Sequence, residues 1–303
     1  SYSIRFDHHF TERNRMFVRY SYDDTPFMRA PVYGQDFASI APTAGPQSFT
    51  RFNSVIEDTH TFTPTLLGTF RYSITRLTNF RRPYSDDFPL ESLGLPSYMR
   101  QGMVDPLSLP AITINGYSVS SSIPNIVVGG VIGATDLIRF GGATHSFMGN
   151  VTKVLSSHTL KIGGEYRVVQ FNNQQTGDAA TNFAFAPTWT QGPNANQSSA
   201  TAGLGLATFL LGIPTGGVAP APALALTNKY YAMFVQDSWK VGQKLTVNWG
   251  IRYDYETPRT DRFNQLTNFD YSAASPLKGG GYEPKGGLTY VAVNGQSLSL
   301  IHI

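Results

Sequence analysis

The chain has 303 residues and no cysteine, and 14% of its residues are charged while 13% are aromatic. A charged share well below the ~25% of ordinary soluble domains, combined with so many aromatic residues, argues against disorder and favours strands over helices. The net charge of +3 comes from scattered basic residues, which argues against nucleic-acid binding, and the lack of cysteine excludes disulfides and cysteine-based metal sites.

Four pairs of extended segments follow one another along the chain, each joined by a short turn. The pairs lie near residues 2–23, 51–78, 143–171 and 228–257, and Thr, Asn, Ser, Pro or Gly occupies every junction. Each pair predicts a β-hairpin. The expected strands of about 9 to 13 residues are long enough to cross a bilayer at a tilt.

Long segments rich in Pro, Gly, Ser and Asn separate the hairpins. They span residues 24–50, 79–142 and 172–227. Loops of this size are uncommon inside compact domains. Tight periplasmic turns that alternate with long external loops are typical of outer-membrane barrels. We therefore expect the four turns on the periplasmic side and the three loops on the external side.

The strand expected at residues 244–256 shows the alternation of side chains most clearly. Every second residue from Leu245 to Tyr255 is apolar or aromatic, and polar, charged or glycine residues lie between them. Successive side chains of a strand point to opposite faces, so this strand has one apolar and one polar face. In the preceding strand, the sequence leaves open whether the Phe234 row or the Val235 row belongs to the apolar face.

A soluble antiparallel sandwich would alternate in the same way, because its apolar face lies in the core. Three features favour a membrane barrel instead. Aromatic residues gather toward strand ends, as in an interfacial girdle; turn and loop lengths alternate regularly; and charged residues lie in mid-strand on the opposite face. We predict an all-β fold, an antiparallel transmembrane β-barrel fragment of about eight strands in four hairpins with long external loops. Since open sheet edges cannot face lipid, it should be part of a larger barrel.

A set of segments points to one known family. They are HTLKIGGEYR at 158–167, FLLGIP at 209–214, residues 228–258 and RFNQLTNFD at 262–270, and residues 58–76 fit the same pattern. Together they resemble the barrel of TonB-dependent receptors, most closely the Oar-like group, which carries a carboxypeptidase-regulatory-like domain ahead of its plug. The resemblance covers most of residues 1–290. It implies a barrel of about twenty-two strands in the outer membrane of a Gram-negative bacterium.

The resemblance also implies a function and partners. It implies energised uptake of a bulky nutrient, such as an oligosaccharide, peptide or siderophore, with TonB acting through a plug and TonB box. Outer-membrane lipid would surround the barrel. We expect the plug, the TonB box and the N-terminal domain to be absent from these residues. Residues 291–303 are set apart as a candidate non-native tail, because the ending SLSLIHI matches nothing expected of the family.

No motif in the sequence points to catalysis, a cofactor or a metal. The six histidines show no ligand spacing, and the adjacent His8 and His9 would point to opposite faces of a strand. Residues 126–136 are rich in glycine but lack the full G-x-G-x-x-G spacing, so we interpret them as an external loop. We expect neither an enzyme nor a cofactor.

Two sets of residues are candidates for function. The first is charged and should face the lumen: Lys161, Glu165, Arg167, Arg252, Asp254 and Glu256. These side chains either compensate one another in a water-filled lumen or contact the plug and line the permeation path. The second set, Tyr33, Tyr98 and Tyr117 in the loops, could stack on sugars or other planar ligands.

Two other interpretations stay open at this point. The first is a passive porin or a surface adhesion barrel without energy coupling. The second is a soluble secreted β-sandwich that binds carbohydrate.

Overall fold

A computed structural model provides the structure of the chain. It describes residues 1–31, 33–41, 45–103, 108–117, 119–120, 127–128, 131–132, 137–176, 178–194, 196–197, 202–219, 223–275, 281 and 283–290. The expected tail at 291–303 and most of the glycine-rich segment at 126–136 lie outside the described residues.

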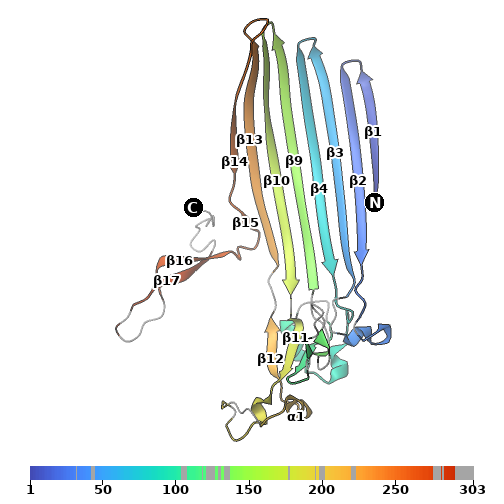
Figure 1. The fold of residues 1–303 in the computed structure, drawn as a ribbon, viewed down its shortest axis with the longest axis vertical. Helices are drawn as coiled ribbons and strands as arrows, with labels where there is room; N and C mark the ends of the chain where they lie inside the picture. Colours follow the sequence, from blue (N-terminus) through green and yellow to red (C-terminus); the bar gives the residue numbers. More distant parts are fainter. Residues whose placement is uncertain are drawn as a thin grey trace.

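One antiparallel sheet of eight long strands dominates the structure (Figure 1). The strands, in their order across the sheet, are β1 (Tyr2–Thr11), β2 (Asn14–Phe27), β3 (Gln47–Thr63), β4 (Leu66–Arg81), β9 (Leu137–Leu155), β10 (His158–Thr176), β13 (Leu224–Lys240) and β14 (Thr246–Glu256). A short strand, β15 (Thr260–Asp261), also pairs with β13. Neighbours along the chain are neighbours in the sheet, so the prediction of an antiparallel sheet built from four hairpins is confirmed.

The strands extend further toward the loops than the alternation indicates. β9 and β10 have 19 residues each. Their pairing continues along the polar end of β10, with Asn173 opposite Phe140 and Thr176 opposite Leu137. Polar side chains do not prevent this extension, because the ladder is made by backbone groups, which pair whatever the side chains are.

One row of side chains crosses all eight strands and defines the apolar face of the sheet. Its members are Phe6, Val18, Ile56, Tyr72, Phe147, Tyr166, Tyr231 and Tyr255. From Tyr72 onward the rings contact one another in sequence, with centroids 4.8, 6.2, 5.1 and 6.3 Å apart. Cross-strand aromatic pairs of this kind stabilise a sheet and fix its register.

The register of β13 answers the question left open by its sequence. Val235 lies opposite Ile162 and Ile251 on the apolar face, whereas Phe234 lies opposite Gly163 and Arg252 on the other, polar face. Glycine makes room for this ring: a Cβ atom built on Gly163 would lie 2.7 Å from Cζ of Phe234. An aromatic ring over a strand glycine covers backbone that would otherwise be bare.

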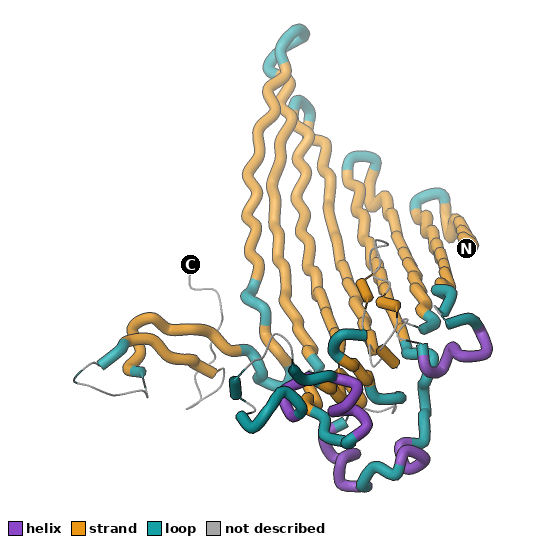
Figure 2. Tube along the Cα trace, turned by 60° about the horizontal axis from the view of Figure 1, so that its bottom comes forward, coloured by secondary structure: helices purple, strands orange, loops and turns teal. Residues whose placement is uncertain are grey.

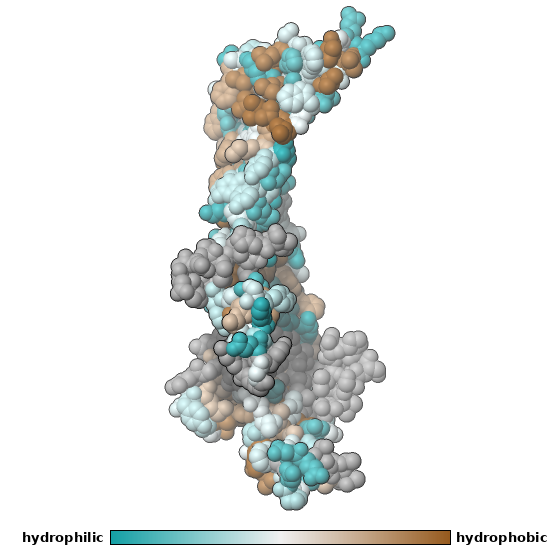
Figure 3. All heavy atoms as spheres, turned by 90° about the vertical axis from the view of Figure 1, so that its left-hand side faces the viewer, coloured by the Kyte–Doolittle hydropathy of each residue, from teal (hydrophilic) through white to brown (hydrophobic). Residues whose placement is uncertain are grey.

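The apolar face is open to its surroundings. Met233, Ile251 and Tyr253 keep 69%, 70% and 67% of their surface exposed. Figure 3, which faces the β14 edge, shows hydrophobic residues gathered over the upper part of the sheet. In the described part of the chain no second sheet packs on this face. This exposure differs from a soluble β-sandwich, whose aromatic residues would be buried between two sheets.

The apolar face has the height of a bilayer core. On β13 charged residues bound it at Lys229 and Asp237, which are eight residues apart. At ~3.3 Å per residue this span is roughly 26 Å, close to the ~25 Å band of outer-membrane barrels. The strands also tilt relative to the row of side chains from Phe6 to Tyr255. β2 begins four residues before its member of this row, Val18, whereas β13 ends nine residues after its member, Tyr231. The turns accordingly step along the sheet in Figures 1 and 2, as in barrel strands.

The long loops are partly folded. They contain β5 (Ala111–Ile114), β6 (Val119–Ser120), β7 (Val127–Val128), β8 (Val131–Ile132), β11 (Asp178–Phe185), β12 (Thr215–Ala219), α1 (Gly205–Leu210) and the 3-10 helices η1 (Gln35–Ile40), η2 (Leu90–Leu93), η3 (Ser97–Gly102) and η4 (Pro187–Trp189). The helices gather at the end of the sheet opposite the turns (Figure 2). No helix in the described segments is long and apolar enough to cross a membrane.

Two of the loops share a small sheet, which we call the loop sheet. Its order is β12-β11-β5-β8, and β11 pairs with β5 in parallel although the two strands come from different loops. Ala180 and Phe185 of β11 and Thr208 of α1 are buried. The centroids of the Phe185 and Phe209 rings lie 5.0 Å apart. The loops at 79–142 and 172–227 therefore fold together as one packed unit.

A separate hairpin lies beyond the large sheet. It consists of β16 (Thr267–Ala274) and β17 (Lys285–Tyr290), and it extends away from β14 in Figure 1. The sequence did not predict this pair.

Both outer edges of the large sheet are open in the described structure. β1 pairs with β2 alone and β14 with β13 alone. Unpaired backbone groups cannot be left in hydrocarbon. In a membrane both edges must therefore be paired, either with each other or with further strands.

A pair of arginine substitutions on β13 tests the assignment of the two faces. Met233→Arg places a charge in the middle of the apolar face and should lower the free energy of unfolding by ~2–4 kcal/mol, the usual cost at a bilayer midplane. Gln236→Arg, three residues away on the polar face, should cost no more than ~1 kcal/mol, the scale of its repulsion with Lys161 on the opposite strand. Denaturant unfolding of the membrane-inserted protein measures both. Equal costs would contradict the assignment.

Candidate functional site

The six charged candidates all lie on the polar face. Lys161, Glu165 and Arg167 alternate along β10, and their cross-strand partners Gln236, Ala232 and Tyr230 belong to the same face of β13. Those residues in turn lie opposite Gly250, Asp254 and Glu256 of β14, and Arg252 is opposite Phe234. The sheet thus brings two charged strands, separated by β13, onto one surface.

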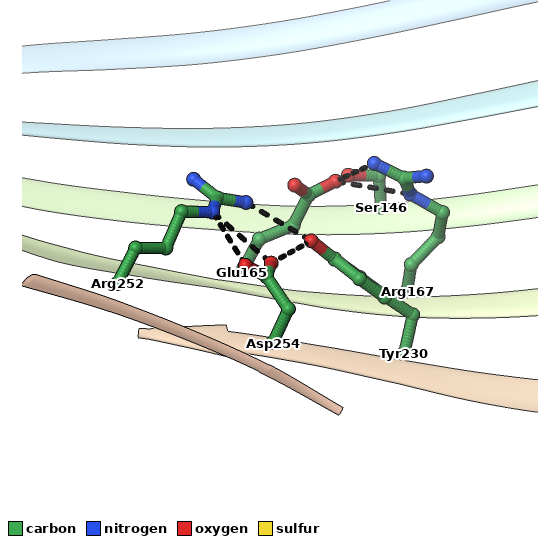
Figure 4. Close-up of polar contacts among 6 residues, drawn as sticks. All are labelled: Ser146, Glu165, Arg167, Tyr230, Arg252 and Asp254. Atoms are coloured by element: carbon green, nitrogen blue, oxygen red, sulfur yellow. Dashed lines mark hydrogen bonds and ion pairs between the residues drawn. The ribbon is translucent and has the colours of Figure 1, made fainter. Parts of the chain in front are cut away.

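Glu165 and Arg167 form an ion pair at the centre of this surface (Figure 4). Arg167 Nη2 and Nε donate to Glu165 Oε1 at 2.5 and 3.0 Å, and the Ser146 hydroxyl donates to the same oxygen at 3.0 Å. The Glu165 side chain is only 11% exposed. A carboxylate this buried needs such donors, because desolvation penalises its charge.

Tyr230 connects this pair to a second one on β14 (Figure 4). Arg252 Nε donates to both oxygens of Asp254 at 3.0 Å, and Arg252 Nη2 donates to the Tyr230 hydroxyl at 2.9 Å. The Tyr230 hydroxyl donates to Asp254 Oδ1 in turn. The guanidinium of Arg167 lies 4.9 Å from the centre of the Tyr230 ring, within cation–π distance.

The remaining two candidates lie outside this network. Glu256 accepts a hydrogen bond from Asn228 Nδ2, and Lys161 Nζ lies 6.0 Å from the centre of the Phe234 ring. Across the sheet the same pattern of pairing recurs in Glu57 with Arg71 and in Asp7 with Arg5. Most charges of the polar face are therefore compensated in place.

Sequence reasoning missed the uncharged partners Ser146, Tyr230 and Asn228. A signal for them exists only in the register, because Ser146 and Tyr230 lie directly opposite Arg167 on the two neighbouring strands.

Within the described residues no group of His, Asp and Glu is arranged to hold a metal ion. The polar face can thus hold water, ions or a polar protein surface.

The three loop tyrosines lie at the loop end of the sheet, on separate segments. Tyr33 is half-buried just before η1, Tyr98 is 69% exposed within η3, and Tyr117 is 42% exposed just after β5. Asn115, two residues before Tyr117, donates its backbone N–H to the carbonyl of Phe185. That bond anchors the Tyr117 segment to the loop sheet.

A hollow of ≈ 650 Å³ lies at the loop end of β2, β3 and β4, and sequence reasoning did not find it. We call it the β2–β4 hollow. Its walls include Phe27, Phe80 and Tyr84, and its polar groups include Arg82 and Asp86. Arg82 Nη1 lies 2.5 Å from Asp86 Oδ2, and its guanidinium carbon lies 4.7 Å from the centre of the Phe80 ring.

A buried carboxylate fixes the chain where β14 leaves the sheet. Asp261 accepts backbone hydrogen bonds from Ala225 at 2.9 Å, Gln265 at 2.9 Å and Phe263 at 3.2 Å. Burial acts to raise the pKa of Asp261, but these bonds to the charged form outweigh it and hold the pKa below its ordinary value.

The lowered pKa of Asp261 determines how the stability of this hydrogen-bonded segment depends on pH. Because the folded pKa of Asp261 is lowered, its stabilisation is complete above the ordinary value of 3.8 and is lost as the pH falls through the folded pKa. Hydrogen exchange of residues 261–266, corrected for intrinsic rates, should show protection at neutral pH that disappears in strong acid. Asp261→Asn should remove much of it at neutral pH. Unchanged protection in the variant would refute the anchor.

A second substitution tests the buried ion pair. Glu165→Gln leaves Arg167 without its counter-charge and should lower the free energy of unfolding by ~1–3 kcal/mol. Asp7→Asn is the matched control, since the Arg5–Asp7 pair is exposed and exposed pairs contribute little. Denaturant titration compares the two. A loss as large in the control would show that burial does not distinguish these pairs.

Comparison with known families agrees with this geometry. The sequence model of a family described as outer membrane beta barrel domain matches residues 1–302. No curated protein matches the chain significantly. An exposed apolar face of bilayer height, opposite a charged face, is what such a domain requires. The chain therefore belongs to the outer membrane beta barrel domain family, and its large sheet lies in the outer membrane.

Proposed function

We propose that the large sheet is the barrel portion of a TonB-dependent receptor of the Oar-like group, in the outer membrane of a Gram-negative bacterium. Its function would be the energised uptake of a bulky nutrient rather than catalysis. The observation that carries this proposal is the asymmetry of the two ends of the sheet. Short turns close one end, and a packed unit built from two loops lies at the other (Figure 1).

The packed loops support ligand capture. Binding residues often lie on loops that a rigid scaffold holds in place. Here the parallel pairing of β5 with β11 joins the two longest loops, and Ala180 and Thr208 of the loop at 172–227 are buried. A surface of this kind suits a bulky ligand, because little order has to be created when the ligand binds.

The paired charges support a lumen that holds a plug over one that conducts ions passively. Ion-selective pores expose rings of like charge to the permeating ion. On the polar face described above, Arg167 and Arg252 each have an acidic partner on the same strand, two residues away. Such a surface offers alternating charges to a polar protein segment and gives little preference to either sign of a mobile ion.

The composition of the third long loop favours an uncharged nutrient. Residues 179–228 contain no Asp, Glu, Lys or Arg. Together with the exposed rings of Tyr98 and Tyr117, this favours an oligosaccharide or a neutral peptide over a charged siderophore. Rings stack on the flat apolar faces of such ligands, and amide and hydroxyl side chains supply the hydrogen bonds.

Uptake measurements test energy coupling directly. Cells that carry the full-length protein should take up labelled neutral oligosaccharides or peptides, and a protonophore should abolish uptake while surface binding persists. Cells without the gene provide the background. Uptake that survives the protonophore would overturn the proposal in favour of a passive porin, and binding without any uptake would favour an adhesion barrel.

The loop tyrosines can be tested in the same assay. Tyr98→Ala should raise the concentration needed for half-maximal uptake roughly threefold to tenfold, because an aromatic contact contributes ~0.5–1.5 kcal/mol. Tyr271→Ala is the matched control, since Tyr271 is 82% exposed but lies on β16 outside the loops. If both variants behave like the wild type, Tyr98 does not contact the ligand.

A further inference from the structure

Helix α1 packs on the loop sheet through its smallest side chains. Gly205 and Thr208 are its buried residues. A Cβ atom built on Gly205 would lie 2.5 Å from the carbonyl oxygen of Asn115, next to β5, and 2.7 Å from that of Phe185 on β11. Only glycine allows the helix to approach the strands this closely. The small residues of α1 therefore form its contact with the protein, and its leucines do not.

The large apolar residues of this region are turned toward solvent instead. Leu210 and Leu211 are 77% and 60% exposed, although an amphipathic helix usually places such residues in the core. α1 lies beyond the loop ends of the large sheet (Figure 1), so the membrane does not cover them. We call the exposed set the α1 patch: Trp189, Leu204, Phe209, Leu210, Leu211 and Ile213. Apolar patches exposed to water are typical of surfaces that bind a ligand or partner.

An open strand edge follows the α1 patch directly along the chain. β12 begins two residues after Ile213, and in the described part of the chain it pairs with β11 alone. The Gly217 carbonyl accepts a hydrogen bond from Thr181 Oγ1 at 3.0 Å, so it points toward β11. Backbone groups alternate between the two edges of a strand. Those of Val218 therefore point to the open edge, where they can pair with another chain.

The sequence of β12 leaves this edge accessible. Proteins often protect an exposed edge with charged residues or proline, and β12, with the sequence TGGVA, has neither. Gly216 and Gly217 are exposed, and nothing lies within 4 Å of a Cβ atom built on Gly217. Glycine in a strand often marks a place where another backbone approaches closely. An extended peptide can bind such an edge as an added strand.

The chemistry around the edge favours an uncharged, apolar peptide. Residues 179–228, which include the α1 patch and β12, contain no charged side chain. A charged ligand group would lose its water there without gaining an ionic partner. Leucine and isoleucine have neither the flat ring on which a sugar stacks nor a group that can bond its hydroxyls. They do match the aliphatic side chains of a peptide.

We propose that the α1 patch and the open edge of β12 together bind an extended, uncharged peptide with large aliphatic side chains. The peptide backbone would pair with β12 as a further strand, and the side chains on one of its faces would pack on the α1 patch. This inference rests on the proposed uptake function and names its substrate class, a peptide rather than an oligosaccharide.

Calorimetric binding to the full-length protein in detergent micelles tests the site. The probe is a short peptide of alternating leucine and glutamine with both termini blocked. The same peptide with every amide N-methylated keeps its side chains but donates no backbone hydrogen bond, so it should bind about tenfold more weakly. A linear maltooligosaccharide should not displace the unmodified peptide. These comparisons use the wild type alone, so they do not depend on the folding of a variant.

Three results of these titrations would overturn the proposal. Equal binding of the two peptides would show that no strand is added to β12. Displacement by the maltooligosaccharide would show a sugar site, and no binding of the unmodified peptide would show that the patch does not take this class of ligand.

Two leucine variants locate the contact. Leu210→Asn should weaken binding of the unmodified peptide roughly tenfold, because a leucine side chain that binding would bury is lost. Leu288→Asn is the matched control, since Leu288 is 61% exposed but lies on β17, outside the patch. Both side chains are exposed in the free protein, so neither change should unfold it. Unchanged binding in Leu210→Asn, or an equal loss in both variants, would refute the site.

A second copy of this chain is the other occupant that an open edge can take. Light scattering of the same samples distinguishes it: the wild type and Leu210→Asn should have the same mass. An oligomer that Leu210→Asn dissociates would show an interface between copies and overturn the peptide assignment. Binding in micelles needs no energy, so failed peptide binding leaves the protonophore experiment intact, and passive uptake would leave the peptide site intact. A failure of this inference is therefore distinguishable from a failure of the transport proposal.

Discussion

Cross-strand register determines what each side chain of the large sheet meets. Because side chains alternate, a slip of one residue in any hairpin would turn its apolar row toward water and its charged row toward lipid. The aromatic row from Tyr72 to Tyr255 opposes such a slip, since each ring packs on the ring of the next strand. Backbone pairing between the strands then satisfies the polar backbone groups that the bilayer could not, except at the two open edges of the sheet.

The polar face and the loops follow from this arrangement. Once the apolar row faces lipid, Glu165 and Arg252 must lie on the other side, where ion pairs and the Tyr230 hydroxyl stabilise their charges. The strands also continue beyond the membrane as ordinary paired strands, as β9 and β10 do. This extension gives the loops a rigid base on which β5 and β11 can pair.

The hairpins could be predicted from the sequence because their signals are local: alternation within a strand and turn residues between strands. The faces of β13 could not, because both of its rows contain apolar residues and the decision depends on Gly163 of a neighbouring strand. The loop sheet joins Ile112 to Phe183, far apart in the chain. The β2–β4 hollow likewise draws its walls from three strands, so no local pattern indicates either.

A spin-label scan of β14 measures the two environments most directly. The chain has no cysteine, so a nitroxide can be attached to single cysteines introduced along Thr246–Glu256 in the full-length protein in bilayers. Collision rates with oxygen and with a water-soluble nickel complex should alternate with a period of two. Oxygen should dominate at Trp249, Ile251 and Tyr253, and nickel at Gly250 and Arg252. Rates without this period, or with the two faces reversed, would contradict a sheet that separates lipid from water.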